Sequence, residues 1–155
     1  QWDENFVPWK ISENESASGE TSAPSYVFWD NQFVNDYSVA WEYDASSNQY
    51  KRSNGGQPHI DLNTNQQIMA KNIVIAFMEE SPANDGYTQG TRLVYANKGK
   101  GNALFFMNGQ VIEGNWSKKD RQSRTIFRDT NGEEISFNPG LIWISVLPTG
   151  NEVNY

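Results

Sequence analysis

The stretch that decides the fold is "KNIVIAFMEE", residues 71–80. It contains the most continuous apolar run of the chain, Ile73 to Met78, rich in β-branched residues and bounded by polar ones. A half-exposed strand alternates apolar and polar side chains, whereas a strand covered on both faces is apolar throughout. The run is also too short for a typical buried helix. We therefore expect an interior strand with protein on both sides.

Short apolar runs separated by turn signals continue outward from this strand. The dipeptide "NG" at 108–109 and the "TNG" at 130–132 predict tight hairpins, and "GKG" at 99–101 is interpreted as a third turn. Helical spacing is confined to "TNQQIMAK", residues 64–71. The predicted fold is mainly β, a β-rich α+β domain with a predominantly antiparallel sheet and short helical turns. The other expected strands are 25–30, 39–44, 49–53, 91–97, 102–108, 110–116, 123–129, 134–138 and 140–148.

The first 24 residues differ in composition from the rest. Residues 12–24 are acidic, serine-rich and almost free of apolar side chains, which predicts a flexible linker. Before them, residues 5–11 form a small apolar island that is expected to dock on its own domain, on a neighbour or on a second copy. We divide the chain into an N-terminal arm and linker, residues 1–24, and a single β-rich domain, residues 25–155. Exchange of the arm between copies is a possible route to self-association.

Composition excludes several functional classes. The chain has 155 residues and a net charge of −7, which argues against general nucleic-acid binding. It has no cysteine, so thiolate catalysis and cysteine metal sites are ruled out. No apolar segment approaches the roughly 18 residues of a transmembrane helix. Phosphate-loop, dinucleotide and EF-hand motifs are absent, and with one histidine and no cysteine we expect neither a cofactor nor a metal.

The charge is unevenly distributed along the sequence. Residues 1–50 hold nine acidic residues and one basic residue, whereas residues 98–128 hold seven basic and two acidic residues. Such a split can serve an anionic partner, either a polymer or a protein, or it can let the two halves attract each other. The sequence leaves both interpretations open.

The only histidine lies in "NGGQPHID", residues 54–61. His59 and Asp61 are two residues apart, so on an extended strand they share a face. They are the catalytic candidates, as a general base with its orienting carboxylate, and with Tyr50 and Arg52 on the preceding strand they form a candidate ligand-binding group. The alternative is a structural turn in which Asp61 caps the backbone that follows it. No nucleophile motif accompanies the pair.

A second candidate is "GNWSKKDRQSRTIFRD", residues 114–129. Trp116, Lys118, Lys119 and Arg121 combine an aromatic ring with cations, a mixture that binds anionic polymers or sugars. The alternative is an edge hairpin whose lysines and arginines keep other strands from pairing with it.

Taken together, these segments resemble the C-terminal half of the YerB-like lipoprotein family of bacterial envelopes. The resemblance rests on Tyr50-x-Arg52, Pro58-His59-x-Asp61, Lys71 to Val74 and Gly114-x-Trp116-x-Lys118. It implies an exported, extracytoplasmic protein and no particular reaction. The expected function is therefore a non-catalytic binding or structural domain of the envelope; the alternative is a cell-wall-directed hydrolase that uses His59 and Asp61.

Overall fold

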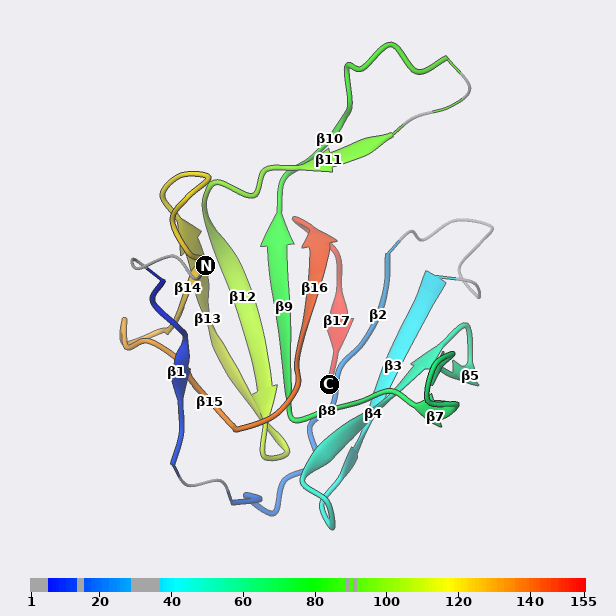
Figure 1. Cartoon of the computed structure of the whole chain (residues 1–155), viewed down its shortest axis with the longest axis vertical. Coiled ribbons are helices and arrows are strands. Elements are labelled where there is room, and N and C mark those ends of the chain that lie inside the picture. Colours follow the sequence, from blue (N-terminus) through cyan, green and yellow to red (C-terminus); the bar gives the residue numbers. More distant parts are fainter. Residues whose placement is uncertain (1–5, 14–15, 29–36, 89, 91) are drawn as a thin grey trace.

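The computed structural model describes residues 6–13, 16–28, 37–88, 90 and 92–155. Its central element is β9 (Asn72–Met78), which lies inside a five-stranded sheet as predicted (Figure 1). Within β9, Ile73 and Ile75 face one hydrophobic core and Val74 and Ala76 face another, all of them buried. The expectation of a strand covered on both faces is confirmed.

The large sheet contains four further strands. Its order is β14 (Ile126–Asp129), β13 (Gln110–Lys118), β12 (Gly99–Met107), β9 and β16 (Ile142–Pro148). β9 pairs antiparallel with β12 and parallel with β16, and the remaining pairs are antiparallel.

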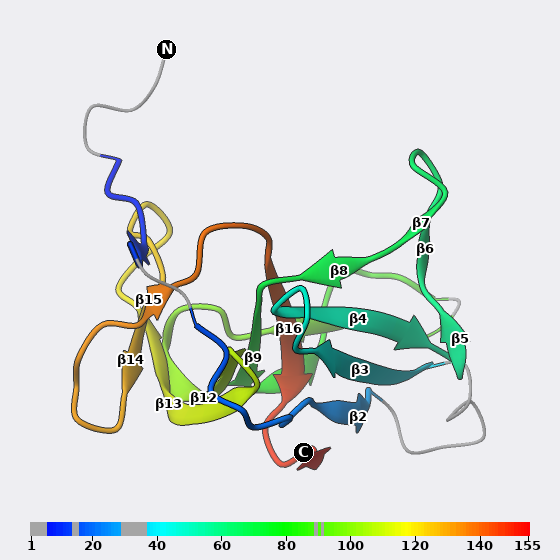
Figure 2. The same cartoon turned by 90° about the horizontal axis from the view of Figure 1, so that it is seen from below.

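A second, antiparallel sheet covers the Ile73 and Ile75 face. Its order is β17 (Val153–Asn154), β2 (Ser25–Val27), β3 (Ser38–Asp44), β4 (Gln49–Asn54) and β5 (Gln57–Pro58), with β8 (Met69–Ala70) also paired to β4. Its strands follow β16 on the side away from β12 (Figures 1 and 2). Aromatic side chains of this sheet, among them Trp41, Tyr43 and Tyr50, pack against the large sheet in the first core. The predicted strand 25–30 is observed as β2, which ends at Val27, and residues 29 and 30 lie outside the described residues.

Three two-stranded sheets complete the described chain. β6 (Ile60–Asp61) pairs with β7 (Gln66–Gln67), and β10 (Glu80–Pro82) pairs with β11 (Leu93–Tyr95), both antiparallel. The β10–β11 hairpin projects from the end of the large sheet (Figure 1). β1 (Lys10–Ile11) pairs in parallel with β15 (Ser136–Phe137) and lies beside the second core. The mainly β, predominantly antiparallel fold is thus confirmed.

The apolar island at the N-terminus docks on its own chain. The Trp9 ring contacts Phe127 and Phe137, with centroid distances of 5.5 and 5.9 Å, and its Nε1 donates a hydrogen bond to the Thr125 carbonyl at 2.7 Å. Phe6, in contrast, is 62% exposed. Docking is therefore confirmed for Trp9, which closes the second core.

The predicted NG hairpin is confirmed at the β12–β13 turn. Asn108 and Gly109 have φ angles of 57° and 78°, the left-handed pair that a type I′ turn requires. A Cβ atom at position 109 would lie 2.1 Å from the Glu20 carbonyl oxygen, so only glycine fits. That approach is held by two hydrogen bonds, from the Ser18 amide to the Asn108 carbonyl and from the Ser22 amide to the Gly109 carbonyl.

Two local predictions are wrong. Residues 64–71 form no helical turn, because they divide between the Thr64–Asn65 turn, β7 and β8, where pairing with neighbouring strands outweighs weak helical spacing. The "GKG" at 99–101 is not a turn but the start of β12, paired with Trp116 to Lys118. Gly101 is needed there because a Cβ atom would lie 2.5 Å from the Phe77 carbonyl oxygen and 2.6 Å from Trp116 Nε1.

Removing the Trp9 ring should destabilise the domain. We expect Trp9→Ala to lower the free energy of unfolding by about 2–3 kcal/mol, less than the roughly 3–5 kcal/mol of a fully buried aromatic because Trp9 is half-buried. Leu62→Ala, at a side chain that is 95% exposed, is the control and should change it by less than about 0.5 kcal/mol. Urea denaturation measures both. Equal effects of the two variants would contradict docking through Trp9.

Candidate functional site

A buried arginine lies between the two sheets. β4 and β3 pair Arg52 directly with Trp41, and the alternation of β4 turns Arg52 inward. The guanidinium carbon is 5.9 Å from the Trp41 ring centroid and 4.8 Å from that of Trp143 on β16. Only 5% of Arg52 is exposed. Two tryptophans from different sheets therefore hold one cation by cation–π contact.

His59 adjoins this guanidinium at the half-buried end of the site. Its Nδ1 is hydrogen-bonded to Arg52 Nη1, and its ring stands edge-on to Trp143 at 6.2 Å. The turn that returns the chain from β4 to β5 positions it, with the His59 amide donating to the Arg52 carbonyl at 2.9 Å. Because Arg52 can only donate, Nδ1 must be the acceptor and the imidazole proton resides on Nε2.

The electrostatics keep this histidine neutral. Burial, and then the positive charge of Arg52, lower the pKa of His59 below its usual 6.5. Burial also lowers the pKa of Arg52, although a guanidinium remains charged throughout the working range of proteins. Within the described part of the chain, no carboxylate forms an ion pair with Arg52.

Asp61 does not orient His59. One of its oxygens, Oδ1, accepts hydrogen bonds from the Asn63 amide at 2.9 Å, the Thr64 amide at 2.8 Å and the Thr64 hydroxyl at 3.1 Å. These bonds lower the pKa of Asp61 and close the β6–β7 turn. Asp61 therefore caps its own turn, which was the structural alternative to an orienting carboxylate.

Tyr50 is likewise separate from the imidazole. It is fully buried in the first core, and its hydroxyl accepts a hydrogen bond from the Gly109 amide at 3.0 Å. Burial raises its pKa above the usual value of a tyrosine. Of the four residues predicted to converge, the structure joins Arg52 and His59 by a direct contact and uses Tyr50 and Asp61 in the packing and in a turn.

The second candidate, in the basic segment, forms a cationic hollow of about 620 Å³ where β12 begins and β13 ends. We use this name for the space lined by Gly99, Lys100, Ser117, Lys118, Lys119, Ser123, Arg124 and Ile126. Lys118 Nζ donates to the Ser123 carbonyl, and Arg124 forms a two-pronged ion pair with Glu134 at 2.6 and 3.0 Å. Lys100 and Lys119 are exposed, and neither is ion-paired within the described chain.

The other two residues predicted for this segment lie outside the hollow. Trp116 is buried, at 2% exposure, and its Nε1 donates to the Phe77 carbonyl at 2.8 Å. It therefore offers no face for a ligand to stack on. Arg121 is exposed on the neighbouring loop but does not line the hollow. What remains of the predicted aromatic and basic surface is its basic part.

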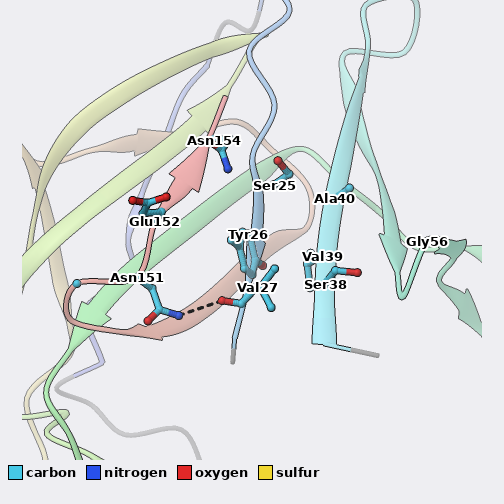
Figure 3. A pocket seen from close by; sticks show the side chains of 11 residues that line it. Ser25, Tyr26, Val27, Ser38, Val39, Ala40, Gly56, Asn151, Glu152 and Asn154 are labelled. Carbon is cyan, nitrogen blue, oxygen red and sulfur yellow. Dashed lines mark hydrogen bonds between the residues drawn. The ribbon is translucent and has the colours of Figure 1, made fainter. Parts of the chain in front are cut away.

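A further pocket of about 590 Å³ lies between β2, β3 and the turn before β17 (Figure 3). Its polar lining consists of hydroxyl and amide groups and one carboxylate, Glu152, and Asn151 crosses it to donate to the Val27 carbonyl at 3.0 Å. No cation and none of the sequence-predicted site residues line it. We therefore assign it no part in anion binding.

Among the described residues, no group of three or more histidine and acidic side chains is gathered as metal ligands would be. The same part of the chain has no helix of the length and apolar content that crossing a membrane requires.

Sequence reasoning missed the two tryptophans that hold Arg52. The cross-strand pairing of Trp41 with Arg52 follows from the register of the β3–β4 hairpin, which the short "ASSN" turn could have supplied. For Trp143 no sequence signal exists, because it approaches from the other sheet.

Comparisons with known proteins place this architecture in a family. Residues 29–144 match the family described as the DUF3048 C-terminal domain, of unknown function, and the chain belongs to it. The "Putative lipoprotein YerB" of Bacillus subtilis (strain 168) is 29% identical over 110 residues, covering 71% of this chain and 31% of that protein. The crystal structure of the Bacillus subtilis YerB protein matches with a TM-score of 0.74 and 25% identity, covering 96% of this chain and 47% of that one. The resemblance seen in the sequence is confirmed, and the chain spans less than half the length of this relative.

The contact between Arg52 and His59 should make stability depend on pH. Because the pKa of His59 is lowered on folding, the unfolded chain binds a proton at His59 more readily than the folded chain does. The contribution of neutral His59 to the free energy of unfolding is therefore fully present above pH 6.5 and is lost as the pH falls through the folded pKa. We expect the free energy of unfolding to decline between pH 7 and 5, as urea denaturation at each pH would show.

The control for that measurement is His59→Gln, which keeps an acceptor for Arg52 but does not titrate. Since His59 is the only histidine, the difference between the two proteins isolates its titration. A difference that stays constant from pH 7 to 5 would contradict the contact.

Proposed function

We propose that this domain is a non-catalytic, extracytoplasmic binding module of the bacterial envelope, and that the cationic hollow binds an anionic envelope polymer. The name of the Bacillus subtilis relative, a lipoprotein, supports the location. The hollow supports the binding role.

The observation that carries the proposal is the unneutralised charge of the hollow. Lysines from the start of β12 and the end of β13 surround it, and no carboxylate is among its lining residues. Arg124 is the exception, because Glu134 already neutralises it. Lys119 has the Asp120 carboxylate as an electrostatic neighbour, but neither Lys100 nor Lys119 forms an ion pair within the described chain. In a chain with a net charge of −7, a local group of lysines outside ion pairs favours a specific anionic partner over general attraction.

The shape of the hollow favours a polymer over a small ligand. Lys118 and Arg124 are held by Ser123 and Glu134, whereas Lys100 and Lys119 are exposed on long side chains. Point charges of this kind bind repeated phosphate groups through many weak contacts, which exposed lysines supply. A phosphodiester polymer of the cell wall fits these properties.

The hydrolase alternative lacks such support. It requires His59 as a base with Asp61 as its orienting carboxylate, whereas His59 accepts a hydrogen bond from Arg52 and Asp61 accepts three from its own turn. An imidazole whose Nδ1 accepts from a guanidinium is also a weaker base than a free one, because adding a proton would bring two cations together.

Neutralising the two free lysines should weaken polymer binding. A lysine beside an anionic surface is worth about 1 kcal/mol, so Lys100→Gln with Lys119→Gln should raise the dissociation constant for a soluble glycerol-phosphate polymer by about 30-fold. Binding of the unaltered domain should also fall steeply with added salt, since screening acts over about 8 Å at physiological ionic strength. Titration calorimetry at two salt concentrations measures both effects.

The matched control is Lys51→Gln with Arg92→Gln, which changes the net charge equally. Both of these cations already have carboxylate partners, Asp44 and Asp85, each at 3.0 Å. Their loss should leave polymer binding nearly unchanged. An equal loss in both double variants, or binding that ignores salt, would overturn the proposal.

A further inference from the structure

The space around Arg52 holds more hydrogen-bond donors than acceptors. We call this the Arg52 site and define it by Tyr26, Trp41, Arg52, His59, Trp143 and Ser145. Arg52 alone carries five N–H groups. Nη1 donates a hydrogen bond to His59 Nδ1, and Nη2 donates a long one, at 3.4 Å, to Asn54 Oδ1. Its Nε has no hydrogen-bond partner although it is buried.

The neighbouring tryptophan shows the same deficit. Trp41 Nε1 is buried and also lacks a hydrogen-bond partner. The Tyr26 hydroxyl lies near both Trp41 and Arg52, but neither of the two unpartnered N–H groups forms a well-aligned hydrogen bond to it. It is 2.6 Å from the Ser145 hydroxyl, to which Trp143 Nε1 donates at 3.2 Å. Native proteins satisfy nearly all buried polar groups, so an unpartnered N–H on a buried cation and a second on the ring beside it are unusual.

Arg52 also has no anionic partner within the described chain. A buried guanidinium ordinarily has a carboxylate or phosphate as its partner, because removing an unpaired charge from water is costly. Here no carboxylate within the described chain pairs with the guanidinium, which instead adjoins the faces of Trp41 and Trp143, a neutral imidazole and the Tyr26 hydroxyl. His59 therefore occupies the place at the guanidinium where an anionic oxygen would be expected.

We propose that the Arg52 site binds one carboxylate group of a small molecule or of a peptide terminus, which displaces His59 from Arg52 Nη1. The half-buried rings of His59 and Trp143 form the outer boundary of the site, so movement of His59 opens a route to the guanidinium. This site is separate from the cationic hollow and goes beyond the polymer-binding function.

The chemistry of the site favours a carboxylate over a phosphate. Two oxygens in a plane match the fork of a guanidinium and accept two parallel hydrogen bonds. A single negative charge balances the single cation, whereas a phosphate dianion would bring surplus charge into a dry space between two indoles. Inorganic phosphate should therefore bind at least tenfold more weakly than acetate.

The test follows the side-chain N–H resonances of Arg52 and Trp41 by nuclear magnetic resonance. In the complete chain, acetate and N-acetylalanine should shift the Arg52 Nε and Trp41 Nε1 signals saturably, and N-acetylalaninamide, which lacks the carboxylate, should not. Tighter binding of N-acetylalanine than of acetate would identify a peptide terminus as the source, and equal binding would identify a free small carboxylate.

His59→Ala distinguishes a binding site from a structural cation. If His59 is a displaceable occupant, its removal should increase the affinity for acetate about tenfold, the equivalent of one modest hydrogen bond of about 1.4 kcal/mol. Lys119→Gln, which alters the cationic hollow, should leave the affinity for acetate unchanged. This control shows that acetate binds at the Arg52 site independently of the hollow.

Resonances of Arg52 and Trp41 that stay fixed in both the unaltered domain and His59→Ala would overturn the proposal. Arg52 would then be a cation that the two tryptophans hold for packing alone. Because this result is obtained without changing Arg52, it does not depend on whether an Arg52 variant folds.

Discussion

The need to cover both faces of β9 governs the arrangement of this domain. A strand with no polar side can be stabilised only between two cores, and each core must be closed by a different part of the chain. The second sheet, which contains β2, β3 and β4, closes the Ile73 and Ile75 face with its aromatic residues. On the other face the covering consists of β13, β14 and β15 side chains and of Trp9. The second core therefore depends on a segment far away in the sequence, and the first depends on a complete sheet.

The same division explains which parts of the fold could be predicted from the sequence. The interior position of β9 and the hairpin at Asn108 and Gly109 rest on local signals, an apolar run and a pair of residues that tolerate positive φ. The errors occurred where a local signal was weaker than a distant partner. Gly101 looks like a turn residue, yet it is a strand residue whose missing side chain makes room for the Trp116 indole. No rule applied to residues 99–101 alone contains that information.

The candidate sites show a similar limit. The sequence grouped Arg52 and His59 with Tyr50 and Asp61, and of these four the structure brings Arg52 and His59 into contact, because one lies on a strand and the other directly after the following turn. It could not reveal that Arg52 is buried, since arginine is usually exposed and the burial depends on Trp143 arriving from the other sheet. Asp61 illustrates the opposite case. Its two possible roles, orienting carboxylate or backbone cap, differ only in side-chain rotation, which the spacing of residues does not determine.

The parallel pairing of β9 with β16 bears on how the domain folds. The hairpins β3–β4 and β12–β13 join neighbouring segments, so each can form on its own soon after collapse. β16, however, is separated from β9 in the sequence by the strands β10 to β15. Pairing the two strands closes a large loop, which costs conformational entropy before any contact is gained. Domains dominated by such distant pairings fold slowly. Until β16 arrives, one long edge of β9 has no partner strand, so the partly folded chain exposes an apolar strand edge of the kind on which aggregation begins.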